Sequence, residues 1–133
     1  MKRVLIVDDV PEIRRLVRLA IGNHDVHECA SAEEALNLLF KLGGVDLIIL
    51  DVMLVHPRDG LALLAAVRNH RAWAHTRVLM LTGRDSPDDR KKAQSLGANA
   101  YFTKPFSPNE LSDCVERLLR DGTPPTLAGA AQH

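Results

Sequence analysis

Val4-Leu5-Ile6-Val7-Asp8-Asp9 is an unbroken apolar run that ends in two carboxylates. β-Branched residues favour an extended strand, and a continuous apolar run is typical of a strand that is covered on both faces. The same pattern recurs at Leu47-Ile48-Ile49-Leu50, where a carboxylate, Asp51, again follows directly. Strands of this kind belong to a parallel sheet with helices packed on both sides.

Segments with a helical period alternate with these apolar runs. In residues 11–21, Ile13, Leu16, Val17 and Ala20 recur at helical spacing, which predicts that they form one buried face. The predicted strands span residues 4–7, 26–30, 47–50, 77–81 and 98–102, and the predicted helices lie within residues 11–21, 31–43, 60–69, 86–96 and 107–120.

Five strands that alternate with five helices predict an α/β domain with a flavodoxin-like, doubly wound (βα)5 fold. The sheet should hold five parallel strands in the order 2-1-3-4-5, with the polar second strand near an edge. We expect the domain to cover residues 1–120. Residues 121–133 are rich in Pro, Gly, Ala and Thr without periodicity, and we expect a flexible tail or linker there.

Composition argues against several classes of function. The 133 residues include 17 Lys and Arg against 17 Asp and Glu, so no basic excess favours direct binding to nucleic acid or to an anionic membrane. No stretch approaches the ~20 apolar residues of a membrane span and no signal peptide is visible, so a cytoplasmic protein is expected. Cys29 and Cys114 lie in apolar segments, where they are expected to be small buried side chains rather than a disulfide.

Polar side chains follow the strands at their carboxyl ends, where open parallel sheets gather their ligands. Asp8 and Asp9 follow the first strand and Asp51 follows the third. Thr82 ends the fourth strand, and Lys104 comes just after the fifth. Three carboxylates, a hydroxyl and an ammonium group should therefore meet in one crevice.

This set of groups suits phosphoryl chemistry. Three carboxylates held together repel one another unless a cation neutralises them, and a site with oxygen ligands alone suits Mg²⁺. A lysine and a hydroxyl can contact phosphoryl oxygens. A carboxylate can act as the nucleophile, which gives an aspartyl phosphate.

The sequence resembles the bacterial response-regulator receiver domains of two-component systems over about residues 2–120. The motifs that carry the resemblance are Val4-Leu5-Ile6-Val7-Asp8-Asp9, Asp51 after an apolar strand, Asp59-Gly60, Leu81-Thr82-Gly83, Gly97-Ala98 and Tyr101-Phe102-Thr103-Lys104-Pro105-Phe106.

The resemblance implies a signalling switch, not an enzyme, that assists its own phosphorylation and dephosphorylation. It would accept a phosphoryl group from a phosphohistidine of a sensor histidine kinase or phosphotransfer protein and then change the surface of its fourth helix, fifth strand and fifth helix. A downstream protein, or a C-terminal effector domain beyond this chain, would receive the signal, with a homodimer on activation as one option.

The resemblance also implies roles for the acidic residues. Asp51 would be the phosphoacceptor. Asp9 and Asp51 would bind Mg²⁺ directly, Asp8 would assist through water, and the backbone carbonyl of Met53 would complete the protein ligands.

Further roles fall on the last two strands. Thr82 and Lys104 would contact the phosphoryl oxygens, and the Lys104–Pro105 peptide bond is expected to be cis. Tyr101 matches the switch aromatic residue of the family, which turns inward when Thr82 is drawn to the phosphoryl group.

One segment departs from the family pattern. The family usually has a Pro four residues after the acceptor and a Gly eight residues after it. Here Val55 holds the first position, Pro57 comes two residues later and Gly60 is nine residues after Asp51. The loop after the acceptor is therefore expected to be one residue longer than usual, with His56 as a solvated loop residue.

The sequence argues against three alternatives of other classes. A small phosphatase with an aspartate nucleophile would carry an Asp-x-Asp pattern after its first strand, which Asp8-Asp9-Val10 lacks. A receiver-like binding module that is not phosphorylated would be expected to carry another residue in place of Asp9, Asp51 or Lys104, and all three are present here. A cobalamin-type domain needs an Asp-x-His-x-x-Gly motif, and the spacing from Asp51 to His56 does not match it.

Overall fold

The computed structural model describes residues 2–54, 60–83 and 86–121 of the chain. Strands and helices alternate through these ranges, as the sequence predicts. The strands are β1 (Arg3–Val7), β2 (Asp25–Cys29), β3 (Leu47–Leu50), β4 (Arg77–Thr82) and β5 (Ala100–Thr103). The helices are α1 (Pro11–Ile21), α2 (Ala32–Leu42), α3 (Gly60–Asn69), the 3-10 helix η1 (Arg71–Trp73), α4 (Pro87–Ser95) and α5 (Pro108–Asp121).

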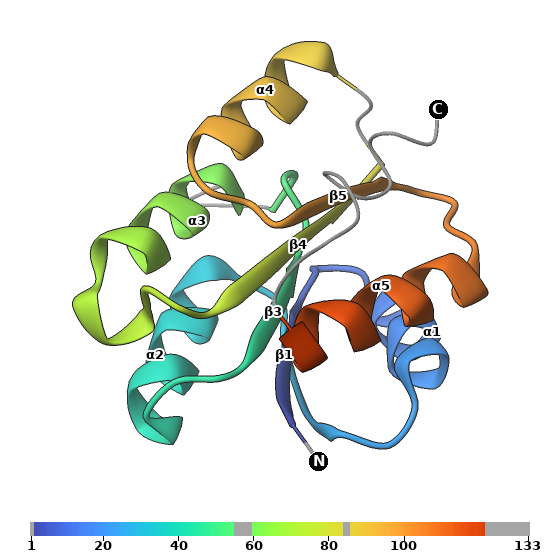
Figure 1. The fold of residues 1–133 in the computed structure, drawn as a ribbon, viewed down its shortest axis with the longest axis horizontal. Helices are drawn as coiled ribbons and strands as arrows, with labels where there is room; N and C mark the ends of the chain where they lie inside the picture. The colour runs from blue at the N-terminus through green and yellow to red at the C-terminus, as the bar shows by residue number, and fades with distance from the viewer. Residues whose placement is uncertain (1, 55–59, 84–85, 122–133) are drawn as a thin grey trace.

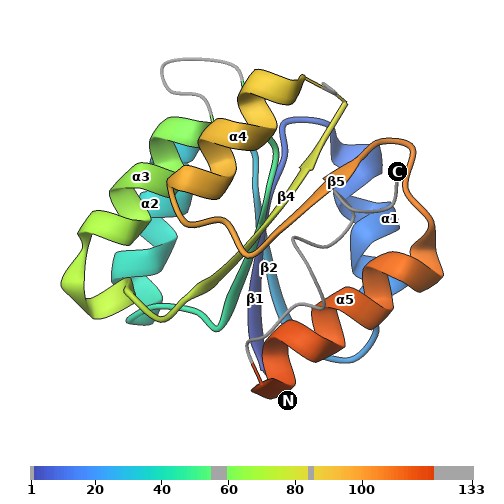
Figure 2. The ribbon, with the colours of Figure 1, turned by 45° about the horizontal axis from the view of Figure 1, so that its top comes forward.

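The five strands form one parallel sheet in the order β2-β1-β3-β4-β5, which confirms the predicted flavodoxin-like α/β fold. Helices cover both faces of the sheet: α1 and α5 lie on one face, and α2, α3 and α4 lie on the other (Figure 1 and Figure 2). The polar strand β2 is at an edge, as expected.

Alternation along the central strands divides the core in two. On β1, Leu5 and Val7 point into the core under α2, α3 and α4, whereas Val4 and Ile6 point into the core under α1 and α5. All four residues of β3 are buried. A strand with apolar side chains on both faces gains from burial only when helices cover both, which explains why unbroken apolar runs mark these strands.

Two details differ from the prediction. Leu16 was expected on the buried face of α1, but its exposed fraction is 52%, because Val17 and Ile21 are the residues that face the sheet and Leu16 lies beside that stripe. The fifth strand begins at Ala100 rather than Ala98. The backbone N–H of Ala98 instead donates to Ala93 O (2.9 Å), so Ala98 belongs to the turn that ends α4.

Both cysteines are buried, as the sequence predicts. Cys29 lies in the core on one face of the sheet and Cys114 in the core on the other, and both thiols are free. Burial raises the pKa of Cys29 to about 12 and that of Cys114 to about 11. Trp73 is buried in the core under α2, α3 and α4. Among the described helices, none combines the length and the apolar character that crossing a bilayer requires.

The start of α3 packs directly on the backbone of the two residues that follow β3, Asp51 and Val52. Gly60 N donates to Val52 O (2.9 Å), and a Cβ placed on Gly60 would lie 1.9 Å from Asp51 O. No real side-chain atom tolerates that approach to a backbone oxygen. A glycine is therefore required where α3 meets the residue that follows β3.

We expect Gly60→Ala to destabilise the domain by about 1–3 kcal/mol, since the added methyl must displace either α3 or the backbone of Asp51. The measurement is urea unfolding followed by circular dichroism. Gly83→Ala is the matched control, because a Cβ there would meet no atom of the described residues within 4 Å. Equal stability of the two variants would contradict the packing seen at Gly60.

Candidate functional site

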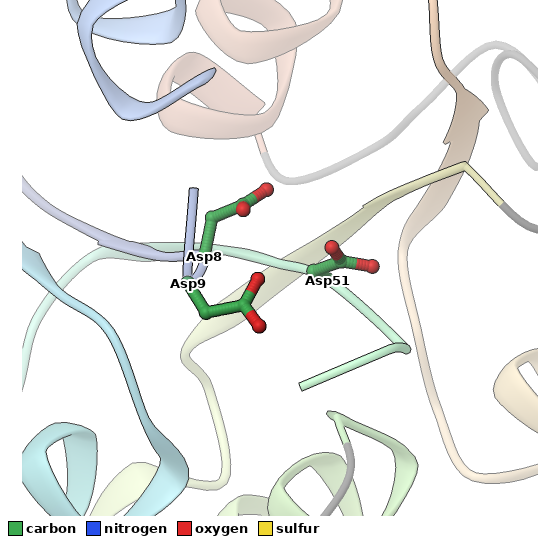
Figure 3. A group of neighbouring side chains, drawn as sticks. All are labelled: Asp8, Asp9 and Asp51. Carbon is green, nitrogen blue, oxygen red and sulfur yellow. The ribbon is translucent and has the colours of Figure 1, made fainter. Parts of the chain in front are cut away.

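The carboxyl ends of β1 and β3 bring three carboxylates together. Asp8 and Asp9 follow β1, Asp51 follows β3, and Figure 3 shows their side chains gathered at this edge of the sheet. One carboxylate oxygen from each lies within 4.8 Å of the others. Among the described residues, this is the one group of three or more His, Cys, Asp or Glu side chains close enough to share a metal ion.

Backbone hydrogen bonds orient two of these carboxylates. Asp8 Oδ1 accepts from Val10 N (2.9 Å), and Asp51 Oδ1 accepts from Met53 N (2.9 Å). In both cases the carboxylate accepts from the backbone N–H two residues later, which fixes the side chain against the loop that follows its strand. The second bond holds the backbone N–H of Met53 beside Asp51, and the carbonyl of Met53, the expected ligand, belongs to the next peptide unit.

Lys104 connects the two buried carboxylates. Its Nζ lies 2.7 Å from Asp8 Oδ2 and 2.9 Å from Asp51 Oδ2. The backbone N–H of Lys104 donates to Thr82 O (2.8 Å), and the Lys104–Pro105 peptide bond is cis. The fifth strand therefore delivers an ammonium group to the carboxylates of the first and third strands.

Burial and charge set the protonation of this site. Burial raises the pKa of the Asp8 carboxyl above its ordinary value and outweighs the hydrogen bonds from Lys104 and Val10, which act to lower it. Burial alone would lower the pKa of Lys104, but hydrogen bonds to Asp8 and Asp51 raise it above its ordinary value. Lys104 is therefore charged at neutral pH, and the three carboxylates still exceed it in charge when all are ionised.

The donor set fits a hard divalent cation. All three side chains offer carboxylate oxygens, and the excess negative charge of the site favours a bound cation. Mg²⁺ prefers oxygen ligands and is usually held by one or two carboxylates with several waters. Asp9 is half-buried while Asp8 and Asp51 are buried, so the site is open to solvent on the Asp9 side.

The residues expected to sense a phosphoryl group lie on β4 and β5. Thr82, at the end of β4, and Tyr101, on β5, are both fully buried. Tyr101 therefore already occupies an inward position in this structure. The longer loop that the sequence predicts, with Val55, His56 and Pro57, lies outside the described residues.

Arg14 supports the site from α1, a role that the sequence did not predict. Arg14 Nη1 donates to Asp8 O (2.6 Å), and Arg14 Nε pairs with Glu28 Oε1 (3.1 Å). Arg18 Nε pairs with the other oxygen, Glu28 Oε2 (2.6 Å). An arginine facing a strand glutamate cannot be recognised from helical spacing alone, because the spacing does not tell which strand lies beside the helix.

Comparisons with known proteins agree with this geometry. The family model of the response regulator receiver domain matches residues 4–116. The chain therefore belongs to the response regulator receiver domain family, the phosphoacceptor signalling modules of two-component systems. A module of this family is not an enzyme in the classical sense.

Individual relatives cover the same region. The transcriptional regulatory protein TrcR of Mycobacterium tuberculosis is 41% identical over 120 residues, which are 89% of this chain and 45% of that protein. A response regulator of Chloroflexus aurantiacus J-10-fl superposes with a TM-score of 0.82 at 34% identity, covering 89% of this chain and 97% of that one. The phosphorylated cyanobacterial phytochrome response regulator RcpA superposes with a TM-score of 0.79 at 26% identity, covering 94% of this chain and 99% of that one. The chain spans about half the length of the curated relatives it matches.

We expect Asp8→Asn to stabilise the metal-free protein at about pH 7, because the raised pKa of Asp8 means that its ionised form is penalised by folding. The sign follows from linkage. A carboxyl with a raised pKa favours folding while it is protonated, and this contribution is lost as the pH rises through the folded pKa. The gain in the variant should therefore grow from about pH 4 to about pH 7. Thermal unfolding in EDTA at several pH values measures it.

Mg²⁺ provides the control for this prediction. A ligand that binds the folded state stabilises it, so Mg²⁺ should raise the melting temperature of wild type more than that of Asp8→Asn. A variant that is less stable than wild type in EDTA, with a deficit that widens as the pH rises, would contradict the charge assignment at Asp8.

We expect Arg14→Ala to weaken Mg²⁺ binding by about 10-fold, because the loop that carries Asp8 and Asp9 loses the hydrogen bond that fixes the Asp8 carbonyl. Isothermal titration calorimetry gives the affinity. Arg15→Ala removes the same charge from the exposed side of α1 and should bind as wild type does. Equal weakening in both variants would show a general charge effect instead.

Proposed function

We propose that Asp51 accepts a phosphoryl group from a phosphohistidine of a sensor histidine kinase or phosphotransfer protein, in a Mg²⁺-dependent reaction. The observation that carries the proposal is the ammonium of Lys104 held between Asp8 and Asp51 at the carboxyl edge of the sheet. The phosphorylated relative RcpA, which has the same fold, supports this assignment.

The transfer step balances with the groups of this site. An oxygen of the Asp51 carboxylate attacks phosphorus, the bond from phosphorus to the imidazole nitrogen breaks, and the imidazole leaves with the electron pair of that bond. The product is an acyl phosphate on Asp51. Lys104 would turn from Asp51 to a phosphoryl oxygen, and the hydroxyl of Thr82 would donate to another.

Asp9 and Asp51 would hold the metal directly, with Asp8 through water and the carbonyl of Met53 as a further ligand. When bound, Mg²⁺ supplies positive charge that offsets the negative charge of the phosphoryl oxygens. The half-buried position of Asp9 supports this, since one side of the site stays open to a partner that brings the phosphoryl group. The same groups would serve the later loss of phosphate, so the domain would assist both reactions.

The signal would pass from Thr82 to the surface formed by α4, β5 and α5. A phosphoryl group on Asp51 adds roughly two negative charges, which would attract Thr82 and Lys104. Because Tyr101 is already buried, phosphorylation would stabilise its inward position further rather than move the ring from an exposed to a buried position.

The partners and the extent of the protein follow from the same proposal. We place the receiver domain at residues 1–120 and a flexible tail or linker at residues 121–133. The signal would pass either to a separate downstream protein or to a C-terminal effector domain joined by this linker. The relatives that are transcriptional regulators are about twice as long as this chain, which favours an effector domain. The domain itself would not bind nucleic acid or membranes, would act in the cytoplasm, and would use a homodimer on activation as one option.

Incubation with acetyl phosphate and Mg²⁺ should add one phosphoryl mass to the wild-type protein and none to Asp51→Asn, because the nucleophile is lost while the size of the side chain is kept. Intact-mass spectrometry measures the product, and hydroxylamine should remove it as it removes acyl phosphates. Asp113→Asn is the matched control, since it changes a carboxylate on α5, away from the acidic site.

Two results would contradict the assignment. A modification that resists hydroxylamine would place the phosphoryl group on another residue type. The absence of any added mass in wild type, under conditions where Mg²⁺ binds, would instead favour a receiver-like module that is not phosphorylated.

A further inference from the structure

Helix α4 is fastened to the sheet by little apolar surface. Of its nine residues, all of them described, Ala93 alone is buried. Among the described side chains of α5, in contrast, four are buried, those of Leu111, Cys114, Val115 and Leu118. Helix stability in a protein comes mainly from packing of an apolar face, so α4 depends on its other contacts to hold its position.

One of these contacts joins α4 to β5. The guanidinium carbon Cζ of Arg90 lies 4.8 Å from the centroid of the Tyr101 ring. Tyr101 is fully buried and Arg90 is half-buried, so the pair is largely shielded from water. A cation within about 6 Å of an aromatic face is attracted to it, and the attraction grows as the pair is desolvated.

Tyr101 also shares a face of the sheet with Thr82. Met80 pairs with Tyr101 and Thr82 pairs with Thr103 in the β4–β5 register. Met80 and Tyr101 both lie in the core under α2, α3 and α4. Because side chains alternate along a strand, Thr82 is directed to this same face. Tyr101 therefore stands near Thr82 in the sheet and contacts α4 through Arg90.

We propose that Arg90 is a positioning residue that keeps the Tyr101 ring inward and fastens α4 to β5 before any phosphorylation. A change at Thr82 would then reach α4 through the Tyr101–Arg90 pair. This second step rests on the proposed function, whereas the first concerns the protein without a phosphoryl group.

Tyr101 is the one tyrosine of the sequence, so 3-fluorotyrosine labelling gives a single ¹⁹F resonance from this ring. The resonance is measured in EDTA, in H₂O and in D₂O, because an exposed ring shifts between the two solvents and a buried ring does not. Arg90→Gln removes the charge, Arg90→Lys keeps it, and Lys91→Gln removes the charge of the exposed neighbouring residue.

We expect wild type, Arg90→Lys and Lys91→Gln to show almost no solvent shift, and Arg90→Gln to shift toward the value of the unfolded protein. Amide exchange in α4 should become about 10-fold faster in Arg90→Gln, while exchange in α5 stays unchanged. A buried resonance in Arg90→Gln, or an exposed one in Arg90→Lys, would overturn the role of the Arg90 charge. Unchanged exchange in α4 would overturn the fastening of the helix.

The phosphorylation assay on the same proteins separates this inference from the proposed function. Arg90→Gln should accept one phosphoryl group from acetyl phosphate to the same extent as wild type, since the contact that carries the role of Arg90 is with the Tyr101 ring rather than with an acidic residue of the site. If neither protein is phosphorylated, the proposed function fails while the ¹⁹F result still decides the role of Arg90. If wild type is phosphorylated and Arg90→Gln is not, Arg90 acts at the acidic site and the positioning role is wrong.

Discussion

Repulsion among three carboxylates is the constraint on which the rest of this structure depends. Asp8, Asp9 and Asp51 hold oxygens within 4.8 Å of one another beside an apolar core, where like charges are expensive. Lys104 offsets part of that charge by contacting two of them, and it can do so because β5 ends at the same edge of the parallel sheet, with β4 between it and β3. The remaining charge is what makes the site ready for a cation and responsive to a phosphoryl group.

Much of this arrangement could be predicted from the sequence, because two simple rules apply to it. Unbroken apolar runs such as residues 47–50 are the signature of strands buried on both faces, and the structure has β3 at those residues. Parallel strands end at a common edge, so the residues after each run had to meet there. Neither rule depends on which helix covers which face of the sheet. For that reason the sheet could be predicted from the sequence, and so could the meeting of Asp8, Asp9, Asp51 and Lys104.

The parts that escaped prediction depend on contacts between elements. Helical spacing placed Leu16 inward, but the direction of the sheet relative to α1 decides that Val17 and Ile21 are buried instead. The contacts of Arg14 and Arg90 were not predicted, since no spacing rule says that one side chain reaches the Asp8 carbonyl and the other a tyrosine ring. The position of a long charged side chain is hard to predict from sequence, because its aliphatic stem can pack on apolar surface while its charged end binds a distant polar group.

The two cysteines have a practical meaning for work on this domain. Cys29 and Cys114 are buried in cores on opposite faces of one sheet, so they cannot reach each other to form a disulfide while the fold is intact. Burial holds both thiols in the protonated, unreactive form at neutral pH. In the folded protein, neither cysteine therefore offers a reactive thiol or a disulfide partner. A cysteine added to the surface would be the reactive thiol of the protein, so a spin label or fluorophore can be attached there without first replacing either native cysteine.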